Sequence, residues 1–211
     1  MQDFRINIMA GLLFSCSLSL FGQGEISDWV LEKEEDEIKI SYRKVELPGK
    51  PEVREMKAEF LVKAAIPDIL EHFRSPAKLI KWQTSTEECT IKELEPEQWR
   101  TYLRFDLPWP FRSKDLVTHN SLRKGAGTAT ITARSTPNAL PQKNKTDRIL
   151  SLECQWSFRS AGEEGTKVIY TSISYDEPEF PRFIADPVVQ RRILKNFGLL
   201  RENAEKEAVE E

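Results

Sequence analysis

Few side chains in this 211-residue chain can bind a soft metal ion, because it contains only three cysteines and two histidines. None of them falls in a CxxC or HExxH spacing, and a structural zinc ion needs four such ligands. We therefore expect no metal ion and no other cofactor. Three cysteines are also too few for a small scaffold held together by many disulfide bonds.

The chain lacks an excess of basic residues. Its 31 Lys and Arg residues are nearly balanced by 34 Asp and Glu residues, for a formal net charge of −3. Nucleic-acid binding depends on a positively charged surface, so a nucleic-acid partner is not expected. For the same reason the sequence offers no polybasic patch that would hold an anionic membrane. The hydrophobic fraction of 39% suffices for the core of one domain.

Long hydrophobic runs are absent except near the N-terminus, where residues 8–21 follow Arg5. This run is shorter than the ~20 residues of a membrane-spanning helix, and it is typical of a signal peptide. We expect residues 1–24 to be removed on export to the periplasm or the exterior. Two alternatives remain open, an uncleaved anchor and a lipoprotein acylated at Cys16.

The predicted mature chain has two cysteines, Cys89 and Cys154, both within strand-like segments. They would form a disulfide bond if they lay together in an oxidising compartment. We favour the other interpretation, two small buried thiols that remain free.

The pattern after the leader predicts an α+β domain over residues 25–205, followed by a charged C-terminal tail at 206–211. Apolar and polar residues alternate in about nine segments, whereas two segments have helical spacing. The predicted strands are 29–34, 38–45, 53–62, 85–91, 99–105, 116–122, 128–134, 149–158 and 167–175, and the predicted helices are 66–75 and 183–208. We expect an antiparallel sheet with the last helix covering one face.

Several short motifs occur in an order that resembles the START family, the steroidogenic-acute-regulatory-related lipid-transfer domains. These are Trp29 before an acidic turn, the segment 79–82 after the first helix, and the Pro-Trp-Pro-Phe run at 108–111. Asp115 and the segment 177–183 complete the resemblance, although Lys114 stands where the family most often has arginine. The resemblance spans about residues 26–205.

The resemblance implies a helix-grip fold, in which a curved antiparallel sheet wraps around the C-terminal helix and encloses a cavity for one hydrophobic ligand. It further implies that the ligand is a lipid or sterol-like molecule. We also expect a monomer, and, because the chain has no polybasic patch, we expect membrane contact to be transient and made by Trp109 and Phe111. From the alternation of the strands and the spacing of the helices we expect the cavity to be lined by Met56, Phe60, Trp82, Leu103, Phe105, Val117, His119, Leu152, Trp156, Phe183, Val188 and Phe197.

An alternative is a cyclase-like enzyme, since the helix-grip superfamily also includes enzymes. The candidate catalytic groups are Asp115 and His119, which share one face of a predicted strand. Four residues of extended chain separate them by about 13 Å, too far for one to orient the other directly. We therefore expect a binding protein without catalytic residues.

Overall fold

A computed structural model describes residues 26–46, 53–107, 112–176 and 180–210. The predicted signal peptide with Cys16, and the predicted membrane-contact residues Trp109 and Phe111, lie outside the described residues. Localisation and membrane contact therefore remain predictions.

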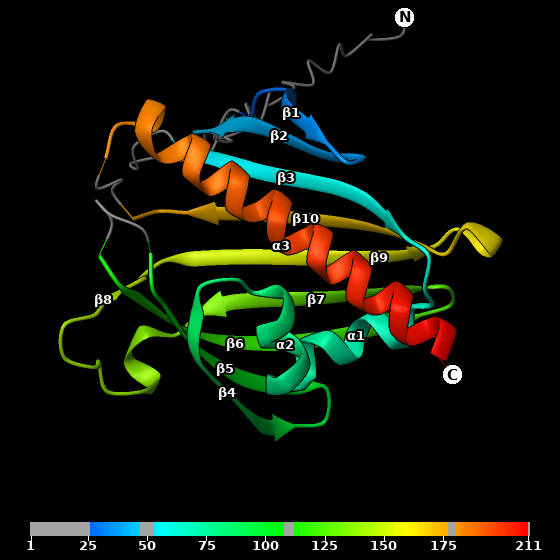
Figure 1. Ribbon diagram of the computed structural model, residues 1–211. Coiled ribbons are helices and arrows are strands. Elements are labelled where there is room, and N and C mark those ends of the chain that lie inside the picture. The colour runs from blue at the N-terminus through cyan, green and yellow to red at the C-terminus, as the bar shows by residue number, and fades with distance from the viewer. Residues whose placement is uncertain (1–25, 47–52, 108–111, 177–179, 211) are drawn as a thin grey trace, which may run out of the picture.

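The described residues form one large sheet in which all neighbours along the main path are antiparallel (Figure 1). The strands follow the order β1-β2-β3-β10-β9-β7-β6-β5-β4, and a short β8 pairs with β6 in parallel. The strand bounds are β1 Val30–Glu35, β2 Ile38–Val45, β3 Val53–Val62, β4 Thr86–Glu95, β5 Gln98–Phe105, β6 Lys114–Gly125, β7 Thr128–Ser135, β8 Asp147–Arg148, β9 Leu152–Ser160 and β10 Thr166–Ser174.

The sheet is open, with β1 at one edge and β4 at the other. Among the described strand pairs, only β1–β2 and β4–β5 have shifts in register, which mark β-bulges or similar irregularities. Both edge strands are mostly exposed and rich in charged residues. The inner strand pairs keep one continuous register, and β3 buries alternate residues, whereas β6 buries residues on both of its faces.

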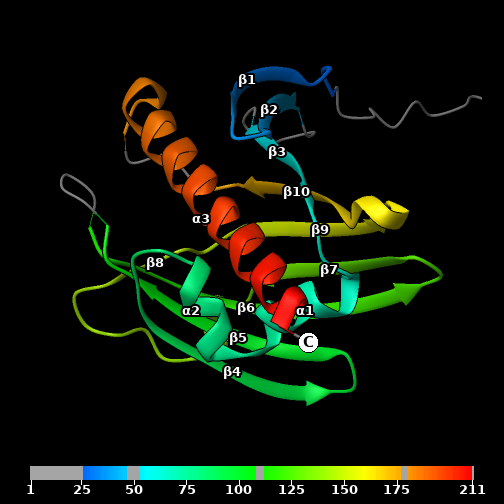
Figure 2. The same ribbon diagram turned by 45° about the vertical axis from the view of Figure 1, so that its right-hand side comes forward.

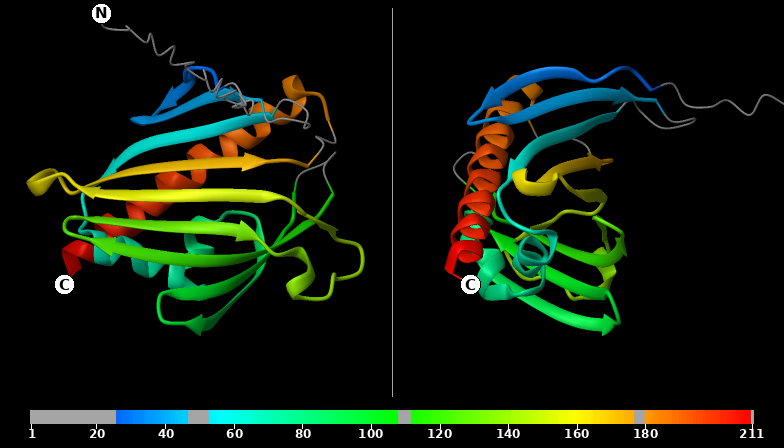
Figure 3. Two further views of the ribbon diagram at one scale, coloured as in Figure 1. Left: turned by 180° about the vertical axis from the view of Figure 1, so that it is seen from behind. Right: turned by 90° about the vertical axis from the view of Figure 1, so that its right-hand side faces the viewer.

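Three α-helices lie on the same face of the sheet (Figures 2 and 3). They are α1 (Ile66–Arg74), α2 (Pro76–Trp82) and α3 (Arg182–Glu210), and α3 crosses the sheet diagonally (Figure 1). Two single-turn 3₁₀ helices, η1 (Pro137–Ala139) and η2 (Gly162–Glu164), lie in loops. The predicted α+β helix-grip architecture is confirmed.

A close approach of two backbones fixes the start of β10. Gly165 has a φ of +102°, and a Cβ atom there would lie 2.2 Å from the carbonyl oxygen of Val62 at the end of β3. Only glycine fits this contact without strain. It allows β10 to begin directly beside the last residues of β3, and so joins the two halves of the sheet.

The first predicted helix, 66–75, agrees with α1, and a second short helix, α2, follows it directly. The first turn of α1 contains Pro67 and Asp68, as expected, and the Asp68 carboxylate accepts a hydrogen bond from the Ala65 amide at 3.3 Å. Pro76 cannot continue α1 because it lacks an amide hydrogen. Ser75 then caps α2 by accepting a hydrogen bond from the Lys78 amide at 3.4 Å. The short helix α2 was not predicted.

The C-terminal helix is longer than the sequence pattern predicts. It continues to Glu210 through the segment expected to be a separate charged tail, and Pro187 near its start does not interrupt it. Ala204 is fully buried and Ala208 packs against the core. The carboxylate of Glu207 forms an ion pair with Lys78 of α2 at 2.8 Å. Packing and this ion pair therefore keep residues 206–210 helical.

An aromatic cluster fastens α1, α2 and α3 to the sheet. The Trp156 ring of β9 lies 4.9 Å from the ring centres of both Phe73 in α1 and Phe197 in α3. It also lies 5.7 Å from Trp82 in α2, whose Nε1 donates a hydrogen bond to the carbonyl of His72 at 3.1 Å. Burial of these rings contributes much of the hydrophobic stabilisation of this layer.

Candidate ligand-binding cavity

A cavity of about 290 Å³ lies between the sheet and the helices, next to the aromatic cluster. Its wall comes mainly from one face of β5, β6, β7 and β9, from α2 and from one side of α3. Trp82, Trp99, Leu103, Phe105, Leu152, Trp156 and Phe197 provide much of its apolar lining. A volume at the lower end of the ~300–1,000 Å³ range of ligand pockets suits one slender hydrophobic group.

Half of the predicted cavity residues line this wall. They are Trp82, Leu103, Phe105, Leu152, Trp156 and Phe197. Met56 and Phe60 are buried in the core but do not line the cavity, because they lie on β3 towards the other half of the sheet. The expectation for these two residues is therefore corrected from cavity wall to solid core.

The prediction also placed Val117 and His119 in the cavity, whereas both lie on the opposite face of β6. The residues of β6 that line the cavity are even-numbered, from Lys114 to Asn120, and side chains alternate between faces along a strand. The ring of His119 instead forms a hydrogen bond with Gln98 Oε1 at 3.0 Å.

The expected α3 residues need a similar correction. Phe183 is 79% exposed, and Val188 is not part of the wall. The helix instead lines the cavity at the spacing of one helical face, i, i+3, i+4, i+7 and i+8. These residues are Val189, Arg192, Ile193, Asn196 and Phe197.

The predicted cavity residues include none of the Thr, Asn, Gln, Lys and Arg side chains that line the wall. Asn120 of β6 donates hydrogen bonds to the Trp99 carbonyl at 3.2 Å and to Thr101 Oγ1 at 3.0 Å, and it accepts one from Thr118 at 3.2 Å. Thr101 shares the odd-numbered positions of the apolar face of β5, so strand parity could have found it. On β6 the buried Val117 lies on the other face, so parity gives no clear signal for Thr118 and Asn120. Their mutual hydrogen bonds remove most of the cost of burying them.

A second polar group ties α3 to the loop after α2. Asn196 accepts hydrogen bonds from the Thr84 amide and hydroxyl at 3.1 and 2.6 Å, and it donates one to Gln83 Oε1 at 3.0 Å. One turn earlier, Arg192 donates to the carbonyl of Thr84 at 3.2 Å. These contacts close one side of the cavity with polar side chains.

Cys154 and Tyr170 are neighbours across β9 and β10, and both line the cavity. The thiol lies 3.3 Å from the tyrosine hydroxyl. Burial raises the pKa of Cys154 to about 11 and raises that of Tyr170 well above its usual value. Both groups are thus protonated at neutral pH, which makes Cys154 a poor nucleophile. Among the described residues both Cys154 and Cys89 are free.

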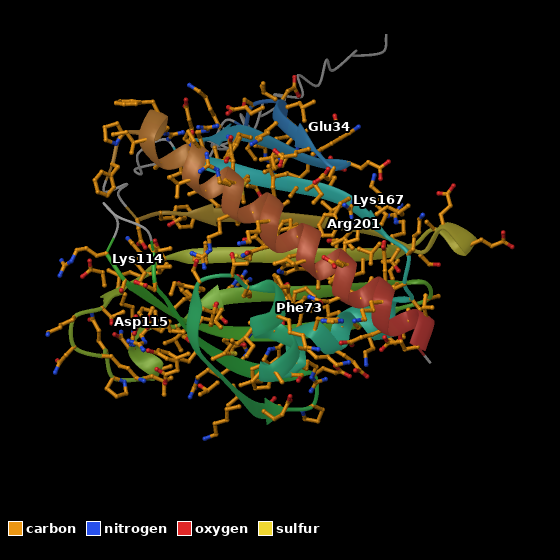
Figure 4. All side chains as sticks on the ribbon, in the orientation of Figure 1. Glu34, Phe73, Lys114, Asp115, Lys167 and Arg201 are labelled. Atoms are coloured by element: carbon orange, nitrogen blue, oxygen red, sulfur yellow. The ribbon has the colours of Figure 1, made fainter. Side chains whose placement is uncertain are left out.

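The two candidate catalytic residues are engaged elsewhere. Asp115 is fully buried and forms a bidentate ion pair with Arg148, with nitrogen–oxygen distances of 2.8 and 2.7 Å. Figure 4 shows Asp115 and Lys114 at the end of β6 beside the loop that carries η1 and β8. Asp115 pairs with Arg148 and His119 pairs with Gln98, so the two candidate residues do not form a hydrogen bond with each other.

A larger hollow of about 1200 Å³ lies at the other end of β6 and β7. Its wall combines the start of α1, the β6–β7 turn and the η2 loop, and includes charged residues such as Lys63, Glu71 and Lys124. We regard the smaller cavity as the candidate site, because it has an aromatic lining and lies under the helices.

Within the described residues there is no cluster of three or more potential metal ligands. Nor is any described helix both long and apolar enough to cross a membrane.

Comparisons with known proteins agree with this geometry. No protein-family model matches the chain. An uncharacterized protein of Pseudomonas aeruginosa is 26% identical over 206 residues, which cover 96% of this chain and 97% of that protein. The crystal structure of a STAR-related lipid transfer protein from Xanthomonas axonopodis superposes with a TM-score of 0.72 at 23% identity, covering 83% of this chain and 98% of that structure.

Two more distant structures share the architecture. Human StAR-related lipid transfer protein 5 superposes with a TM-score of 0.66 at 16% identity, covering 85% of this chain and 86% of that one. The Zhui aromatase/cyclase from Streptomyces sp. R1128 gives a TM-score of 0.55 at 14% identity, over 73% of this chain and 94% of the enzyme. The chain thus has the helix-grip fold of START domains, as the motifs predicted, and this fold occurs in lipid-transfer proteins and in enzymes.

Proposed function

We propose that this protein binds a lipid or another hydrophobic small molecule in the cavity between its sheet and α3, without catalysing a reaction. The observation that carries the proposal is the aromatic and aliphatic lining of a cavity covered by α2 and α3. A hydrophobic guest would remove apolar wall surface from water, at about 25 cal/mol for each Å². The names of the STAR-related structural neighbours support a lipid as the guest.

The aromatase/cyclase neighbour supports an enzyme as the competing function. We favour binding because the titratable side chains of β6 that suggested catalysis, Asp115 and His119, lie on the face away from the cavity. The cavity wall itself contains a thiol and a phenol whose pKa values are raised by burial. Neither is a suitable general base at neutral pH.

Filling the cavity tests the proposal. Ala133 of β7 lines the cavity, whereas its neighbour Thr132 faces the other side of the sheet. We expect A133F to reduce the affinity for a fluorescent single-chain lipid probe by at least about tenfold, since the added ring takes the space of the guest. The matched variant T132F should bind the probe like the wild type. Equal binding by all three proteins would refute a ligand site in this cavity.

Native mass spectrometry of the purified protein provides the complementary test. We expect a co-purified apolar molecule that A133F lacks. A protein that is always empty and binds no lipid probe would overturn the proposal.

The proposal includes export as a monomer and transient contact with membranes through Trp109 and Phe111. The composition supports membrane contact through these two apolar side chains, because a net charge of −3 provides no polybasic patch that would hold an anionic membrane. Co-sedimentation with liposomes should decrease in W109A. Unchanged co-sedimentation would exclude this contact.

A further inference from the structure

Arg192 places a positive charge in the mostly apolar wall of the cavity. Its guanidinium carbon lies 4.4 Å from the centre of the Phe105 ring, a cation–π contact. Its Nη2 donates one hydrogen bond, to the carbonyl oxygen of Thr84. A guanidinium carries five N–H donors. The contacts among the described residues therefore use only a small part of its hydrogen-bonding capacity.

Two other partly buried arginines face a carboxylate. Arg43 pairs with Glu55, and Arg148 pairs with Asp115. Within the described ranges, by contrast, no carboxylate forms an ion pair with Arg192. Burial lowers the pKa of its guanidinium from the usual value, and no acidic neighbour opposes that effect. Arginine nonetheless stays charged at neutral pH.

No Asp or Glu in the described part of the chain lines this cavity. A second basic residue, Lys114, does line it. Lys114 stands directly opposite Phe105 in the β5–β6 register, so its backbone lies at the same end of the cavity as the Arg192 guanidinium. The charge of Arg192 is withdrawn from water without a counter-charge among the described residues, which is costly, and a bound anion would offset that cost.

We infer that the cavity binds an amphiphile with an anionic head, a carboxylate or a phosphate monoester, and that Arg192 binds this head. The guanidinium fork matches both kinds of head, because each offers two oxygens to two parallel N–H groups. The tail lies against the aromatic wall around Trp156. The cavity of about 290 Å³ favours one acyl chain over two. This inference rests on the proposed function, since it specifies the ligand of the same site.

The experiment compares three single-chain probes that differ only in the head group: hexadecanoate, hexadecyl phosphate and the neutral hexadecanol. Binding to the full chain is followed by the fluorescence of tryptophans in the wall, at neutral pH and below the concentration at which the probes form micelles. We expect one or both anionic probes to bind at least about tenfold more tightly than hexadecanol, as a charge-assisted hydrogen-bonded pair would produce. The two anionic probes distinguish a carboxylate head from a phosphate head.

Two substitutions on neighbouring positions of α3 locate the effect. R192Q removes the charge but keeps an amide donor for Thr84, whereas R191Q removes a charge from an exposed position outside the cavity wall. We expect R192Q to bind the anionic probes at least about tenfold more weakly, with hexadecanol affinity unchanged. R191Q should behave like the wild type. R192K keeps a cation and should retain the preference for an anionic head.

The outcomes separate this inference from the proposed function. If the wild type binds hexadecanol as tightly as both anions, or if R192Q weakens all three probes equally, the anionic head is refuted and the binding function stands. If no probe binds to the wild type, the proposed function itself fails. Should R192Q not fold, the preference of the wild type and its retention in R192K decide the question. A preference for the anionic head that R192Q keeps in full would refute the role of Arg192.

Discussion

The buried ion pair between Asp115 and Arg148 should be one of the most sensitive points of the fold. The side chains of Asp115 and Arg148 are 0% and 3% exposed. Arg148 also donates hydrogen bonds to the carbonyls of Pro137, Leu140 and Pro141, so it fastens the loop between β7 and β8 to β6. Removing the carboxylate in D115A leaves a guanidinium that is buried and without its counter-charge.

Breaking such a pair from one side costs about 3–5 kcal/mol of the free energy of unfolding. For a domain of this size that loss corresponds to a decrease of about 6–20 °C in the melting temperature. Urea unfolding followed by circular dichroism should show a lower midpoint with an unchanged m-value, since the surface exposed on unfolding is the same.

A matched control lies in the same loop. Lys143 forms an ion pair with Glu88 at the surface, where the two side chains are 49% and 34% exposed. Because water and salt screen exposed pairs, K143A should lose only a small fraction of what D115A loses. If D115A unfolds at the same urea concentration as K143A, the buried pair does not stabilise the loop and the reasoning is refuted.

The pH dependence of stability should report on His72, which is fully buried and whose pKa is lowered chiefly by that burial, against the attraction of Glu207. Below about pH 6.5 the unfolded chain then binds more protons than the folded one, so the free energy of unfolding decreases as the pH falls through this region. In H72Q the free energy of unfolding should depend less on pH. The same pH dependence in H72Q and the wild type would contradict the assignment to His72. F197A removes a ring that stacks on Phe60 and should cost about 3–5 kcal/mol in thermal unfolding; a loss under about 1 kcal/mol would show that the cluster is loosely packed. Cys154, with its pKa of about 11, should react slowly with iodoacetamide at pH 8, and more slowly still with a bound amphiphile; labelling as fast as in urea would contradict its burial.

The alternation of apolar residues predicted most of the sheet, because the inner strands are buried on one face and their neighbours on the other are more exposed. The bounds 38–45 and 53–62 agree with β2 and β3. The strand β8 has two residues, pairs with β6 and is joined to it by the ion pair between Arg148 and Asp115. Such a contact between residues 33 positions apart has no local signal in the sequence.

The cavity was harder to predict than the fold. On β6 the apolar residues do not follow one parity, since Leu116 faces the cavity and Val117 is buried on the other face. The polar residues Thr118 and Asn120 share the cavity face with Leu116, so a rule that selects apolar residues chooses the wrong side. On α3 the cavity face includes Arg192 and Asn196, and a search restricted to hydrophobic residues passes over both.

The irregular, charged edges of the open sheet bear on how this protein avoids aggregation. A sheet that is not closed exposes two rows of unpaired backbone groups, onto which another copy of the chain could add a strand. In β1 and β4 those rows are interrupted by shifts in register. Charged side chains such as Lys33 and Glu93 would also lie in the interface if a strand of another copy paired with either edge. The regular, continuous register is confined to strands that are already paired on both sides. The open sheet can therefore wrap around α3 and leave space for a guest while its two edges discourage fibril-like growth.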